Sequence, residues 1–107
     1  MMPSDQIAQR DLLFSKKGSS TKMELRVRIG LPRVVDRTST GVLLDPGSAV
    51  CTIVFEGLGI KDIEVHGVDT LHALAQAVDI DKYLLGMRRT LDFFWPNGEP
   101  YFDDTSP

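Results

Sequence analysis

Apolar and polar residues alternate along residues 22 to 30, as expected of a strand with one buried face. Charged residues occupy most of the positions between the apolar ones. The apolar positions are Met23, Leu25, Val27 and Ile29. A shorter strand is predicted at residues 11 to 17, and a Gly-Ser-Ser turn separates the two. The pattern therefore predicts a β-hairpin.

Three further strands are predicted downstream of the hairpin. Residues 48 to 57 (SAVCTIVFEG) are almost entirely apolar, which is typical of a central strand with both faces covered. Residues 58 to 67 alternate again, with Ile63 and Val65 expected to point inward. Residues 88 to 95 are rich in the Thr, Phe and Trp residues that favour strands.

The segment from residue 31 to residue 47 interrupts this series. It contains two prolines and two glycines and shows no sustained period. It is therefore predicted to be a long loop, and long loops inside a small domain are often functional.

One long helix is predicted, and it begins within HGVDTLHALAQAV at residues 66 to 78. Asp69 is a good N-cap before a run rich in Leu and Ala, so the helix is expected to span residues 70 to 87. His66, Asp69 and His72 are spaced three apart, as metal ligands can be. A capping Asp is poorly placed to bind a metal, however, and the chain contains only two histidines. No metal or cofactor is expected.

The polar stripe of this predicted helix is narrow, so a single sheet would leave one apolar flank uncovered. That flank comprises Ala73, Ala77, Ile80, Leu84 and Met87. Either a second copy of the chain covers it in a two-fold dimer, or the loop at 31–47 folds over it. The apolar residues that the loop offers are Leu31, Val34, Val35, Val42, Leu43 and Leu44.

These elements predict an α+β fold: a mostly antiparallel sheet of four or five strands with one long helix on one face, in the order β-β-β-β-α-β. The length of 107 residues fits one domain. Residues 1–9 are expected to form a flexible leader, residues 10–102 the domain and residues 103–107 a loose acidic tail.

Composition excludes several classes of function. The net charge is −3 and no basic run is present, which argues against a nucleic-acid partner. No apolar run approaches the ~20 residues that span a membrane, and no secretory signal is visible at the start of the sequence. Cys51 is the single cysteine and cannot form an internal disulfide, which fits a cytoplasmic location. Its apolar surroundings predict a buried thiol.

The outward face of the predicted sheet carries the candidate binding residues. They are Arg26, Arg28, Glu64, His66 and Phe94. This mixture of charged and aromatic side chains suits either a solvated face with cross-strand ion pairs or a surface that binds another protein.

No nucleophile elbow, phosphate loop or dinucleotide fingerprint is present, so no catalytic residue is expected. The favoured function is a non-catalytic protein-binding or accessory module, for example one that neutralises a toxin. The alternative is a small enzyme or ligand-binding domain with its site between the loop 31–47 and the sheet.

Three stretches resemble a domain-of-unknown-function family of short bacterial proteins. They are the strand end RIGLP, the strand containing Cys51 that leads into EGLG, and the helix start HGVDTLHALAQAV. In that family a Gly-Val-Asp-Ser-Leu-Gln-Ala-Leu pattern opens the main helix; here Thr70 and His72 replace the Ser and the Gln. The resemblance covers about 60 residues and rests chiefly on the helix start. It implies a bacterial α+β domain and supplies no catalytic residues.

Overall fold

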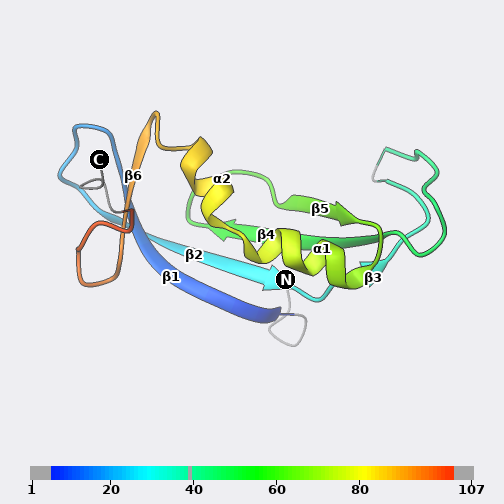
Figure 1. Ribbon diagram of the computed structural model, residues 1–107. Coiled ribbons are helices and arrows are strands. Elements are labelled where there is room, and N and C mark those ends of the chain that lie inside the picture. The colour runs from blue at the N-terminus through cyan, green and yellow to red at the C-terminus, as the bar shows by residue number, and fades with distance from the viewer. Residues whose placement is uncertain (1–5, 39, 103–107) are drawn as a thin grey trace, which may run out of the picture.

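In the computed structural model, which describes residues 6–38 and 40–102, a six-stranded sheet carries two short helices on one face (Figure 1). The elements in chain order are β1 (Gln6–Lys16), β2 (Met23–Gly30), β3 (Arg33–Val34), β4 (Ala49–Glu56), β5 (Ile63–Gly67), α1 (Thr70–Val78), α2 (Asp81–Gly86) and β6 (Leu91–Phe94). The predicted α+β class and mostly antiparallel sheet are confirmed.

Strand β4 lies at the centre of the sheet, as its apolar sequence predicted. It pairs with β5 along one edge, and along the other edge with β2 and then with the short β3. β1 and β2 form the predicted hairpin, with Leu12 opposite Leu25. The last strand, β6, returns to the outer edge of β1 and pairs with Leu13 to Lys16. All these pairs are antiparallel. β3 lies inside the segment that was predicted to be loop.

The first strand is longer than its sequence pattern indicated. β1 begins at Gln6, so residues 6 to 9, which were assigned to a flexible leader, belong to the sheet. They were missed because their side chains are exposed or half-buried, which leaves no alternation to detect. The remaining leader residues, 1 to 5, and the predicted tail, 103 to 107, lie outside the described residues.

The prediction of one long helix is wrong. α1 ends at Val78, because the next residue, Asp79, has a ψ of 64°, which is not helical; α2 starts after Ile80. Asp favours caps and turns over helix interiors because its side chain competes for backbone hydrogen bonds. Asp81, in the first turn of α2, accepts a hydrogen bond of 2.5 Å from the Tyr101 hydroxyl, which anchors the second helix. Neither helix is long and apolar enough to cross a membrane.

The flank of the helices that was predicted to be uncovered is the one that packs on the sheet. Ala73, Ala77, Ile80 and Leu84 are all buried in the core, together with apolar residues from β1, β2, β4, β5 and β6. The large apolar side chains of the helices that are left exposed are those of the opposite flank. They are Leu71, Val78 and Leu85, with 74%, 52% and 50% of their surface exposed.

The segment between β3 and β4 does not cover this exposed flank. Its Val42 and Leu43 are themselves exposed, as is Val34 at the end of β3. In Figure 1 the segment extends beyond one end of the sheet, away from β6. The loop alternative for covering the helix is therefore contradicted for the described residues.

Gly67 explains how closely α1 follows β5. A Cβ atom at this position would lie 2.3 Å from the backbone N of Ala73, far inside the closest contact that real side chains make. The first turn of α1 therefore packs directly on the end of β5, and Ala73 becomes fully buried there. The glycine lets the helix lie flat on the sheet.

Candidate functional site

The sheet face opposite the helices, called the open face below, carries rows of charged and small apolar side chains. Strand register places them: Arg28 of β2 is opposite Val54 of β4, and Thr52 of β4 is opposite Glu64 of β5. In the next row Val50 lies opposite His66. The open face is therefore a mixed surface built from neighbouring strands.

Ion pairs cross the open face between adjacent strands. Arg26 donates to Asp11 at 3.0 Å, and Arg28 contacts Glu56 at 2.9 Å. The side chain of Arg28 is the more buried of the two arginines, at 22% exposed against 45%. Its Nε is buried and has no hydrogen-bond partner within the described part of the chain. The Arg28 side chain is thus less exposed to solvent than the Arg26 side chain.

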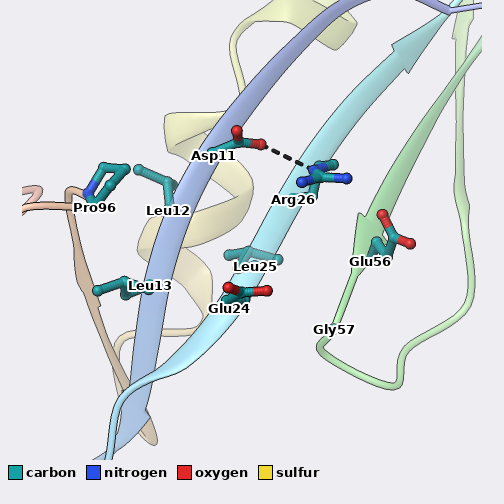
Figure 2. Close-up of a pocket in the computed structure, with 9 residues that line it drawn as sticks. All are labelled: Asp11, Leu12, Leu13, Glu24, Leu25, Arg26, Glu56, Gly57 and Pro96. Atoms are coloured by element: carbon teal, nitrogen blue, oxygen red, sulfur yellow. Dashed lines mark hydrogen bonds and ion pairs between the residues drawn. The ribbon is translucent and has the colours of Figure 1, made fainter.

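One end of the open face contains a hollow of about 410 Å³, called the acidic hollow. Its polar lining consists of Asp11, Glu24, Arg26 and Glu56, and Leu13 and Pro96 add apolar surface. Figure 2 shows Arg26 between the carboxylates of Asp11 and Glu56, which come from the two flanking strands. With three carboxylates around one guanidinium, this end of the face is suited to a positively charged group.

The other end contains a hollow of about 330 Å³, called the basic hollow. It is lined by Arg33, Arg37, Thr38, Glu64 and His66 above Val35 and Val50. Arg33 lies opposite Val50 on β4, which in turn lies opposite His66 on β5, so the three form one row across the sheet. Arg37 comes from the segment after β3 and is held there by an isolated bridge to Leu43.

The structure distributes the predicted binding residues over four places. Glu64 and His66 lie together in the basic hollow, while Arg26 lines the acidic hollow. Arg28 lies between them and is bound to Glu56. Phe94 is on β6 at the far edge of the sheet, opposite Leu13 and under the ammonium of Lys22 at 4.7 Å. The five residues therefore share a face but do not form one cluster.

Sequence reasoning missed Arg33 and Arg37. Both fall in the segment that was predicted to be loop, so neither was assigned to the sheet face. A signal was available, because Arg33, Val35 and Arg37 have the period-two spacing of residues that share one face of a strand. All three line the basic hollow.

The HGVD stretch begins a helix, as predicted. The carboxylate of Asp69 accepts a hydrogen bond of 2.8 Å from the backbone N of His72, which is the N-cap contact. The ring of His72 stabilises the turn before the helix, because its Nδ1 accepts a hydrogen bond from the backbone N of Val68 at 3.0 Å. Among the described residues, no group of three or more His, Cys, Asp or Glu side chains could hold a metal ion.

Two titratable groups are shifted by their surroundings. Burial raises the pKa of Cys51, whose Sγ donates to the carbonyl of Gly30 at 3.2 Å. Burial also raises the pKa of Tyr101, assisted by its hydrogen bond to Asp81 and opposed by Arg10, which donates to the Tyr101 hydroxyl at 2.6 Å. The thiol belongs to the core, and Tyr101 joins the last described segment to β1 and α2. Cys51 and Tyr101 therefore both have a structural role.

The open face therefore presents charged groups of both signs at fixed positions. Two hollows of opposite charge lie at its ends, and ion pairs lie between them. Comparison of the chain with protein-family models, curated proteins and solved structures found no match.

Proposed function

We propose that this protein is a non-catalytic protein-binding module that uses the open face of its sheet. The observation that carries this proposal is the pair of oppositely charged hollows at the two ends of one face, both helices being on the other side. Charges of both signs, fixed on rigid strands, select a complementary partner and orient it. Arg is also among the side chains enriched at protein interfaces.

The partner is another protein whose surface presents a basic group and an acidic group to the two hollows. An accessory or toxin-neutralising role fits such a module, as does a cytoplasmic location with a reduced Cys51. The resemblance to short bacterial proteins at the helix start stays a prediction and brings no activity with it.

Affinity capture with matched charge variants tests this proposal. Arg26→Glu with Arg33→Glu reverses two exposed charges of the open face. Lys82→Glu with Arg89→Glu makes the same change in net charge at exposed positions on α2 and just after it. A protein recovered with the wild type and the control, but lost with the open-face variant, is expected. Equal recovery by both variants, or no specific protein with the wild type, would reject the proposal.

A second function is favoured by the basic hollow alone. Its position between the segment after β3 and the sheet is where a ligand-binding site was expected, and its volume of about 330 Å³ is at the lower end for small-molecule sites. In this case the hollow binds a small ligand, and the rest of the open face is solvated.

Self-association remains a further proposal, on a surface different from the predicted one. Leu71, Val78 and Leu85 are the exposed apolar residues of the helices, and a two-fold contact between two copies would bury them. Sedimentation equilibrium at micromolar concentration should give a dimer mass that Leu71→Gln with Val78→Gln reduces to the monomer. A monomer mass for the wild type, unchanged on tenfold concentration, would rule the dimer out.

A further inference from the structure

The basic hollow combines fixed positive charge with an apolar floor. Val50, which is only 2% exposed, forms part of that floor, and Val35 adds to the lining. Arg33 and Arg37 supply two guanidinium groups, and Glu64 supplies the one carboxylate of the lining. The formal charges of Arg33, Arg37 and Glu64 sum to a single net positive charge.

Within the described residues, the side chains of the two arginines make long hydrogen bonds with their neighbours. Arg33 reaches the Glu64 carboxylate at 3.4 Å, and Arg37 donates to the carbonyl of Gly41 at 3.4 Å. A guanidinium has five N–H donors in a planar fork that matches two oxygens of one carboxylate. Both distances are beyond the 2.7–2.9 Å typical of strong charge-assisted hydrogen bonds. Donor capacity therefore remains for a ligand anion.

We propose that the basic hollow binds the carboxylate of a small, mostly apolar molecule or chain terminus. The single net positive charge matches a monoanion, while a phosphate dianion would leave one negative charge uncompensated beside Glu64. Val35 and Val50 then contact a short aliphatic group attached to the carboxylate. Asp36, which lines the neighbouring surface beside Arg33 and Arg37, further disfavours a dianion. This inference rests on the second proposed function, ligand binding in the hollow.

The test is an NMR titration of the full chain with isovalerate, a branched monocarboxylate, and with the uncharged isovaleramide. Isovalerate should shift the signals of Val35, Val50 and His66 in a saturable way, and isovaleramide should not. Arg33→Gln and Arg37→Gln should each weaken the binding by about tenfold, the effect of losing ~1.4 kcal/mol. Arg89→Gln removes an exposed arginine elsewhere and should bind as the wild type does.

Two further probes, N-acetylvaline and inorganic phosphate, identify the source of the carboxylate and show which results would contradict the proposal. Tighter binding of N-acetylvaline than of isovalerate would indicate the C-terminus of a peptide, and weaker binding would indicate a free acid. Saturable shifts of the same residues with inorganic phosphate but not with isovalerate would contradict carboxylate binding. They would still support a ligand site in the basic hollow. No shift with any probe would overturn both the carboxylate and the second proposed function.

Discussion

The two faces of the sheet make different interactions, although they are built from the same strands. Leu25 and Arg26 are neighbours in β2; Leu25 is 1% exposed under the helices, and the Arg26 side chain is 45% exposed on the open face. The covered face is apolar and packed against α1 and α2. The open face is held by ion pairs between exposed groups. The covered face therefore stabilises the fold, while the open face is available for recognition.

The largest expected effect tests this contrast at adjacent residues. Leu25→Ala should lower the free energy of unfolding by about 2–5 kcal/mol, because it removes buried surface and leaves a cavity. Arg26→Ala should change it by only about 0.5 kcal/mol, as surface substitutions usually do. Urea denaturation of both variants measures the difference. Similar losses in the two variants would show that the open face also contributes to the core.

Much of this contrast could be predicted from sequence, because it follows from alternation. The period of two in residues 23 to 30 correctly predicted the hairpin, the buried positions Leu25, Val27 and Ile29, and the outward arginines. Met23, predicted inward, is 41% exposed because it lies at the strand end. Local pattern is informative where a strand is long enough to repeat it.

The missed features depend on contacts between distant segments. β3 is only two residues long and pairs with β4, and the period-two spacing of Arg33, Val35 and Arg37 is too short to indicate a strand by itself. Because β3 was not predicted, Arg33 could not be assigned to the basic hollow from the sequence. The break at Asp79 was missed because buried residues recur at helical spacing on both sides of it, from Ala73 and Ala77 to Ile80 and Leu84. Apolar spacing alone does not show where hydrogen bonding stops.

A second prediction concerns how the helices reach the covered face. Gly67→Ala should destabilise the protein by about 1–3 kcal/mol, because the new Cβ would meet the backbone of Ala73 at 2.3 Å and push α1 off the sheet. Gly86→Ala is the matched control, since a Cβ there meets nothing within 4 Å. It should be neutral or stabilise α2 by about 0.5–1 kcal/mol. In thermal unfolding, the midpoint should fall for Gly67→Ala and should stay unchanged or rise for Gly86→Ala; equal shifts would contradict the close packing at Gly67.

A third prediction concerns the start of α1. Asp69→Ala should cost about 1 kcal/mol of stability, while Asp69→Asn, which keeps an acceptor for the backbone N of His72, should be almost neutral. Denaturant midpoints of the two variants provide the measurement. Stoichiometric zinc in the purified protein that is lost in both His66→Ala and His72→Ala would show instead that Asp69 belongs to a metal site.

A fourth prediction uses the one thiol of the covered face. Cys51 is fully buried, so a thiol reagent should label the native protein only as fast as it opens, and the denatured protein at once. Burial raises the folded pKa above the ordinary 9.0, so the unfolded thiol loses its proton first as the pH rises. Stability should therefore fall above pH 9, by at most about 1 kcal/mol at pH 9.5 from this group. Cys51→Ala should remove this contribution. Fast labelling without denaturant would place the thiol at the surface.

The smallest effect ranks two ion pairs within the open face. Arg26–Asp11 joins side chains that are 45% and 54% exposed, so a double-mutant cycle with Ala should give a coupling of about 0.2–0.5 kcal/mol that salt weakens. Arg28–Glu56 should couple more strongly, by up to about 1 kcal/mol, because the Arg28 side chain is only 22% exposed and is screened less by solvent. Chemical denaturation at low and high salt measures both cycles. The reverse order, or equal couplings that vanish together in salt, would show that the open face is uniformly solvated. In that case Arg28 would not be a desolvated centre between the two hollows, and the proposed recognition of a partner would depend on the hollows alone.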